Sequence, residues 1–205
     1  MCLPSKGLLH CRHLRLSHKL SSRSRSLLVR TWMGLPVLPS SPIFVDILPQ
    51  LTASRGKLLS GQPVGTAVHA ASFIRNRSIT LESALLSRPD TAKLIFVHEV
   101  FHFVWARLGN SRRREFSHLL VNEIRGGAVG ELGESSAVKK SGIPRGNSVD
   151  RKSRRWRDYA CESFCDTAAW AFATVAECED FTLADRWKGV RKEWFGAAEH
   201  DVWKC

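Results

Sequence analysis

The segment His98-Glu99-Val100-Phe101-His102 places two imidazoles four residues apart, with a carboxylate directly after the first of them. On a helix, residues four apart share a face, with Cβ atoms about 5–6 Å apart. Both rings can then reach one zinc ion at roughly 2.0–2.1 Å. Glu99 flanks the pair and can reach a metal-bound water. This H-E-x-x-H arrangement predicts a centre in which a metal activates water for hydrolysis.

The alternative interpretation is a chance pattern on a buried helix. The surrounding helix is apolar nearly all round, which is typical of a helix inside a core. Two imidazoles and a carboxylate in such a helix need polar partners. A metal ion supplies those partners at once, so the pattern favours a metal site. The apolar positions are Leu94, Ile95, Phe96, Val97, Val100, Phe101, Phe103, Val104 and Trp105.

Catalytic zinc sites usually have three protein ligands and one open position, so a third ligand must lie elsewhere. Glu162 is the better candidate, because Asp166 follows four residues later on the same helical face. A carboxylate at Asp166 can accept the free ring N–H of a zinc-bound histidine and orient it. Glu123 is the rival, closer to His102 in the sequence, but Gly127 stands where an orienting acid would be needed.

An oxyanion intermediate needs a donor besides the metal. Tyr159, the only tyrosine, lies one turn before Glu162 and is the candidate; His118 is a second one. Both residue types also occur in structural roles. Cys161 and Cys165 flank Glu162 and need no function in a packed helix, although Cys165 is a minor candidate for a metal ligand.

The pattern His-Glu-x-x-His at 98–102 followed by Glu-x-x-x-Asp at 162–166 resembles the gluzincin clan of zinc metallopeptidases. The resemblance covers only these two stretches, and Asn122-Glu123 also resembles the third-ligand segment of thermolysin. It implies zinc held by His98, His102 and Glu162, with Glu99 as the general base. It also implies a peptide or protein substrate. The metzincin pattern is absent, because Trp105 and Leu108 occupy its further positions.

The elements that must position these residues are mainly helical. We expect helices over residues 90–108, 111–124, 153–176 and 183–195, and one or two strands within 67–81. Six glycines, together with Pro144 and several serines, predict a long loop over residues 126–150. The fold class is therefore α+β: a mainly helical zincin-like domain, residues 50–205, with a small sheet packed on the active-site helix.

Residues 1–49 form a basic, Ser/Arg/Pro-rich segment that we expect to be a disordered tail. Seven of the 31 Lys and Arg residues precede Val45, and no acid does. Such a composition also fits a transit peptide. With no secretion signal and no C-x-x-C pair among six cysteines, we expect a reducing, cytoplasmic setting. No apolar run is long enough for a membrane span, so membrane insertion is not expected.

Two other functions compete with a peptidase. Arg112-Arg113-Arg114 and the segment Arg151 to Arg157 are basic clusters, the second with an interleaved Trp156, and they suggest a nucleic-acid-associated protein. Solvated helix faces explain the same clusters. A zinc site that only stabilises the fold is the second alternative, but such a site has no need of the base Glu99.

Overall fold

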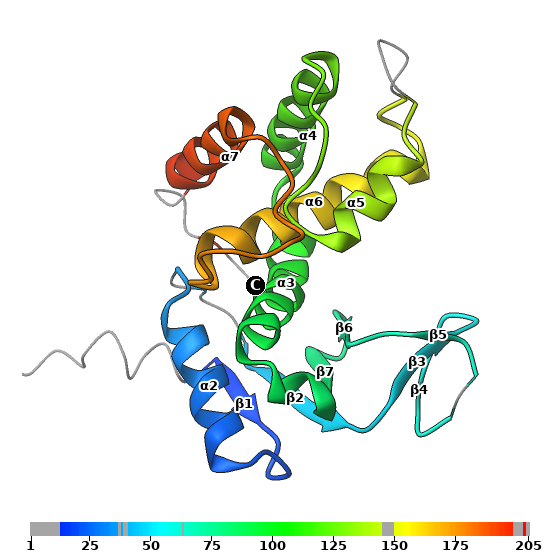
Figure 1. The fold of residues 1–205 in the computed structure, drawn as a ribbon, viewed down its shortest axis with the longest axis vertical. Helices are drawn as coiled ribbons and strands as arrows, with labels where there is room; N and C mark the ends of the chain where they lie inside the picture. Colours follow the sequence, from blue (N-terminus) through cyan, green and yellow to red (C-terminus); the bar gives the residue numbers. More distant parts are fainter. Residues whose placement is uncertain are drawn as a thin grey trace, which may run out of the picture.

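The computed structural model describes residues 13–36, 38, 41–62, 64–144, 150–198 and 203. It shows an α+β fold in which one central helix has the sheets on one side and most of the other helices on the opposite side (Figure 1). The fold class predicted from the sequence is confirmed, whereas the zincin-like character stays a prediction. The elements in chain order are β1 Leu14–Leu16, α2 Ser22–Met33, β2 Ile43–Leu48, β3 Leu51–Ser54, β4 Lys57–Ser60, β5 Thr66–Ala67, β6 Ala70–Phe73, β7 Ser78–Glu82, the short 3-10 helix η1 Ser83–Ser87, α3 Pro89–Arg107, α4 Asn110–Arg125, α5 Glu134–Ser141, α6 Arg154–Phe172 and α7 Asp185–Ala198.

The central helix α3 carries the H-E-x-x-H segment. Pro89 occupies its first turn, where the missing N–H costs nothing and the fixed φ suits a helix. Asp90 adds a negative charge in the first turn, which the helix dipole favours. The chain turns extended at Leu108, one residue after the helix ends. Phe96, Phe101 and other apolar side chains are fully buried on several sides of α3, as its pattern predicted.

A four-stranded sheet packs on one side of α3, in the order β1-β2-β7-β6. β1, β2 and β7 are parallel, with Val45 opposite Ile79, and β6 is antiparallel to β7. Ile79 and Leu81 of β7 are fully buried in the core shared with α3. In this order β6 is one of the two edge strands, and it lies next to α3. A separate sheet, β4-β3-β5, forms a hairpin extension away from the centre (Figure 1).

The prediction of a disordered tail over residues 1–49 is wrong for most of residues 13–49. β1, α2 and β2 fold into the domain, and β2 is an interior strand of the sheet. Helix α2 begins at a cap in which Ser21 accepts a hydrogen bond from the backbone N–H of Ser24. Its buried face includes Leu28 and Trp32, which are fully inaccessible. Composition over the whole segment concealed this apolar spacing. Residues 1–12 of the expected tail lie outside the described residues.

The remaining helices cover the other side of α3. α6 packs directly on α3, and α4, α5 and α7 pack around α6 (Figure 1). The prediction of a long loop over residues 126–150 is wrong in part, because helix α5 lies within this range. No helix in the described part of the chain combines the length and apolar character needed to cross a membrane. Cys161, Cys165 and Cys178 are free thiols, while Cys2, Cys11 and Cys205 lie outside the described residues.

Candidate metal centre

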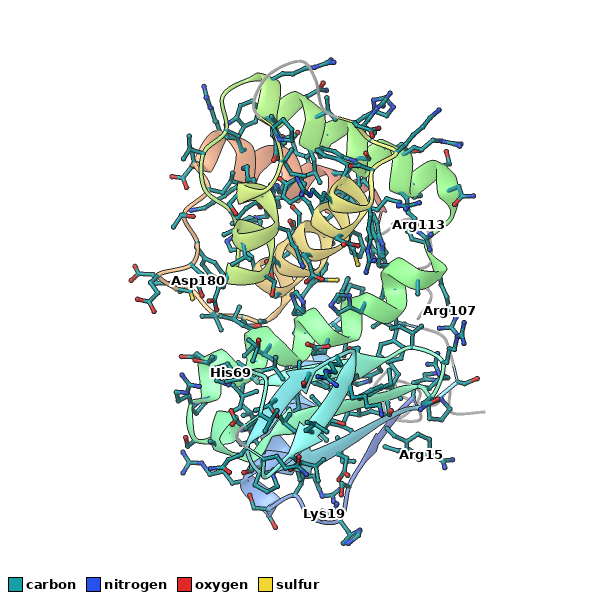
Figure 2. All side chains as sticks on the ribbon, turned by 90° about the vertical axis from the view of Figure 1, so that its right-hand side faces the viewer. Arg15, Lys19, His69, Arg107, Arg113 and Asp180 are labelled. Carbon is teal, nitrogen blue, oxygen red and sulfur yellow. The ribbon has the colours of Figure 1, made fainter. Side chains whose placement is uncertain are left out.

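His98 and His102 lie one turn apart on α3, on the side that faces α6. α3 runs between the sheet and the helical group in Figure 2, so this side of α3 is enclosed by α6 and α5. The packing of α3 on α6 brings together residues about 60 positions apart in the sequence. Glu162 and Asp166 lie one turn apart on α6; Glu162 contacts both histidines, and Asp166 contacts His98.

The Nε2 atoms of the two histidines face each other at 3.1 Å. One carboxylate oxygen of Glu162 lies 3.2 Å from Nε2 of His98 and 3.9 Å from Nε2 of His102. A tetrahedral metal with bonds of about 2.0–2.1 Å keeps its ligand atoms about 3.4 Å apart. These three atoms are thus spaced as the ligands of one small metal ion are, and the residues fit such an ion.

Asp166 holds His98 in the orientation that metal binding needs. Nδ1 of His98 donates to Oδ1 of Asp166 at 2.6 Å, which leaves the Nε2 lone pair for a ligand. The second carboxylate oxygen of Asp166 accepts the backbone N–H of Ser136 at 2.8 Å, at the start of α5. Gly133 permits this approach, because a Cβ there would lie 2.4 Å from the Asp166 carboxyl carbon. Helix α5, absent from the sequence-based prediction, therefore supports the centre.

At its Nδ1 atom, His102 has sulfur partners, where His98 has a carboxylate. Its Nδ1 lies 3.5 Å from Sγ of Cys161 and 3.5 Å from Sγ of Cys165. His98, His102 and Cys165 each offer a ligand atom within 4.8 Å of the others, so these residues could bind a metal ion. Glu162 and Cys165 are accordingly two possible third ligands.

The two candidates differ in the side of His102 that they occupy. Glu162 lies beside both Nε2 atoms, where the two imidazoles converge. Cys165 lies at Nδ1, and the two ring nitrogens of an imidazole point in different directions. A metal shared by both Nε2 atoms therefore has Glu162 beside it and Cys165 behind His102. The geometry favours Glu162 as the third ligand.

Glu99 lies in the same hollow as the three candidate ligands. The hollow, of about 300 Å³, is lined by Ala71, Ser72, Ile74, His98, Glu99, His102, Ser135 and Glu162. The side chain of Glu99 is buried, and the hydroxyl of Ser72 on β6 lies within hydrogen-bond distance of both its carboxylate and its backbone carbonyl, to either of which it can donate its one hydrogen. A second hollow of about 600 Å³ adjoins it and shares His98, Glu99 and Ser135. No sequence pattern linked Ser72 to Glu99, because 27 residues separate them.

The charges of the centre are strongly one-sided. Glu99, Glu162 and Asp166 are close to the histidines, and none of the residues lining the small hollow is Lys or Arg. Burial lowers the pKa of His98, but Asp166 and Glu162 raise it well above its usual value. Burial also lowers the pKa of His102, but the hydrogen bond to Cys161 and the charges of Glu99 and Cys161 together raise it overall. The centre attracts positive charge, as protons or as a metal cation.

The same field acts on the acids and the thiols. Burial raises the pKa of Glu162 and of Asp166. The histidines lower the pKa of Glu162, and His98 and the hydrogen bonds of Ser136 lower that of Asp166, so both values fall below the usual ones. The pKa of Cys161 falls to about 6, first through the hydrogen bond from Cys165 and then, against burial, through His102. Burial raises the pKa of Cys165 well above its usual value. Of the two thiols, Cys161 is the one stabilised as a thiolate.

Two residues considered from the sequence belong to another cluster. Tyr159 is fully buried and donates to Glu131 at 2.6 Å, so the structure does not bring it to the metal centre. The helical twist of α6 directs Tyr159 and Glu162 toward different neighbours. Glu123, the rival third ligand, forms an ion pair with the guanidinium of Arg191 at 2.6 Å. Its carboxylate therefore also belongs to the cluster around Arg191 and not to the histidines. His118 is exposed and contacts Arg151.

Comparisons with known proteins give no further assignment. No protein-family model matches this chain, and neither the curated proteins nor the solved structures give a match. The function must therefore be argued from the residues and their geometry.

Proposed function

We propose that the protein is a zinc-dependent metallopeptidase, with His98, His102 and Glu162 as the zinc ligands and Glu99 as the general base. The observation that carries the proposal is the convergence of two Nε2 atoms and a Glu162 oxygen within 3.1–3.9 Å of one another. Nitrogen and carboxylate ligands in this number leave one position open, which is typical of catalytic zinc. Zinc bound there would supply a Lewis acid that lowers the pKa of a water molecule.

The chain's own residues support the proton transfers of peptide hydrolysis. Glu99 lies in the hollow and is held by Ser72, so its carboxylate is placed to accept a proton from water. The same carboxylate can then deliver that proton to the leaving amine. Asp166 keeps the Nδ1 proton on His98 and thereby keeps Nε2 available.

The edge strand β6 favours a peptide as the substrate. Ala71 and Ser72 of β6 line the hollow, and β7 is the neighbour of β6 in the sheet order. An extended peptide can pair with a free sheet edge through main-chain hydrogen bonds. Such pairing would lay its backbone along the hollow that contains Glu99.

The first test is the metal content of the purified protein, measured by mass spectrometry for the wild type and two variants. We expect about one zinc per chain in the wild type, loss of zinc in Glu162→Ala, and retention of zinc in Cys165→Ala. Zinc lost in Cys165→Ala and kept in Glu162→Ala would replace the proposed ligand set. A folded wild type that binds no zinc would refute the metal centre.

The second test separates a peptidase from a zinc site that only stabilises the fold. Glu99→Gln keeps the shape of the side chain but removes the base, so it should keep zinc and lose about 10²–10⁴-fold of the casein-hydrolysis rate. Undiminished hydrolysis in Glu99→Gln would exclude the role of Glu99. A zinc-loaded wild type that hydrolyses neither casein nor a peptide library would favour the structural alternative.

A further inference from the structure

Two basic segments that are far apart in the sequence lie against each other. Nε1 of Trp156 on α6 donates to the hydroxyl of Ser117 on α4 at 2.7 Å. Just before α6, the guanidinium of Arg151 donates to the ring of His118 on α4, with 2.9 Å between the nearest nitrogens. These contacts join the exposed side of α4 and the beginning of α6 into one surface.

Within the described residues, this surface carries more cations than its acids pair with. Arg112 and Arg154 pair with Glu115 and Asp158 on their own helices. Arg113 is half-buried and donates to the backbone carbonyls of Trp105 and Ala106. Among the described residues, no acid forms an ion pair with the remaining five cations at this junction, and all five are exposed. Nitrogen-tipped side chains project outward along α4 in Figure 2. We call this surface the basic face; its members are Arg114, His118, Arg151, Lys152, Arg155 and Arg157.

We propose that the basic face binds the phosphate backbone of duplex nucleic acid. Like charges that lie close together repel one another, and a polyanion removes that repulsion. Four of the five cations are arginines, whose planar guanidinium matches a phosphate with two parallel hydrogen bonds. Displaced counterions add a favourable, salt-dependent contribution to such binding.

The structure favours a duplex over a single strand. Proteins that bind single strands stack the bases on exposed aromatic rings. Trp156, the aromatic residue of this region, is only 2% exposed and packs between α6 and α4. α4, with 16 residues, is about 24 Å long, roughly seven base-pair steps of a duplex.

A membrane surface is the less suitable partner. A protein face that binds lipid by insertion presents large apolar side chains beside its cations. In the described chain, the large apolar side chains that are exposed belong to other elements, and none comes from α4 or from the beginning of α6. They are Met33, Phe44, Val64, Phe73, Val129, Val138 and Val190.

The test is fluorescence anisotropy with a labelled 20-base-pair DNA duplex and the full-length protein at several salt concentrations. Five phosphate contacts predict a slope of about −4.5 for the logarithm of the binding constant against the logarithm of the salt concentration. The Glu99→Gln variant should bind equally well, which separates this property from hydrolysis. A wild-type slope near zero, or no binding at low salt, would overturn the proposal.

A matched pair of variants separates the basic face from the general positive charge of the chain. Both variants lose four exposed cations as glutamine, and circular dichroism checks their folds. The face variant should bind at least tenfold more weakly with a shallower salt slope, and the control should bind like the wild type. The face variant changes Arg114, Arg151, Arg155 and Arg157, and the control changes Arg23, Arg30, Lys57 and Arg75.

The same measurements also distinguish duplex binding from non-specific attraction, from single-strand binding and from binding to a lipid surface. Equal losses in the face and control variants would show non-specific attraction and overturn the proposal. Stronger binding to a 20-nucleotide single strand, or to phosphatidylserine vesicles, than to the duplex would also overturn it. If the face variant does not fold, the single variants Arg114→Gln and Arg155→Gln, compared with Arg23→Gln, provide the same contrast.

Discussion

Two clusters of buried ionisable side chains lie on neighbouring faces of α6, and only one of them is balanced in charge. Around Arg191, each charged group has an opposite partner: the guanidinium binds Glu123 at 2.6 Å and Glu131 at 2.8 Å. Lys140 adds a second cation 3.1 Å from Glu131. Two cations thus meet two carboxylates, and the hydroxyl of Tyr159 completes the cluster.

The candidate metal centre is built from the same helix, but no Lys or Arg is among the described residues that line its hollow. Three carboxylates lie close to His98 and His102. Burying charge without an opposite charge is costly, so the structure is complete only when protons or a metal ion are bound. The comparison shows which buried polar cluster is structural and which one is suited to a ligand.

The balanced cluster should respond most strongly to the loss of its cation. Arg191→Met leaves Glu123 and Glu131 buried without their main partner, so we expect the free energy of unfolding to fall by about 3–5 kcal/mol. Urea denaturation measures this change, with Lys192→Met, an exposed position on the same helix, as the control. A loss similar to that of the control would show that water reaches the two acids and that the cluster is not closed.

The unbalanced cluster should lose metal affinity more than stability when its orienting acid is changed. Asp166→Asn weakens the hydrogen bond to Nδ1 of His98, and we expect the zinc affinity to fall about 10–100-fold. Competition with a chromogenic chelator measures the affinity. Asp158→Asn, on the exposed side of α6, is the control. Unchanged affinity in Asp166→Asn would mean that His98 keeps its orientation without this acid.

The thiols beside His102 provide the smallest and most local test. In the metal-free protein, the pKa of Cys161 is lowered to about 6, so the thiolate fraction rises with pH through 6 and levels off near 7. Alkylation of Cys161 by iodoacetamide should follow this curve, as mass spectrometry of the modified peptide can show. Burial raises the pKa of Cys178, which should therefore react slowly at neutral pH. A midpoint near 9 for Cys161 would contradict the influence of Cys165 and His102.

The sequence predicted the long elements well because their patterns are strong. The expected helix 90–108 corresponds to α3 Pro89–Arg107, and the expected helix 111–124 corresponds to α4 Asn110–Arg125. It failed for α2 and α5, where basic residues, serines and glycines dominate the composition. α2 is stabilised by the packing of Leu28 and Trp32, and the start of α5 is stabilised by the hydrogen bond to Asp166.

The sequence by itself determined the spacing of the reactive groups along two helices. His98 and His102 share a face of α3, and Glu162 and Asp166 share a face of α6, because helical geometry requires it. The sequence favoured Glu162 over Glu123, but only the tertiary structure showed which of them lies beside the histidines and that Tyr159 belongs to another cluster. Local spacing does not specify which helix faces pack together. The packing of α6 on α3 placed Glu162 beside the histidines, and the pairing with Arg191 removed Glu123 from them.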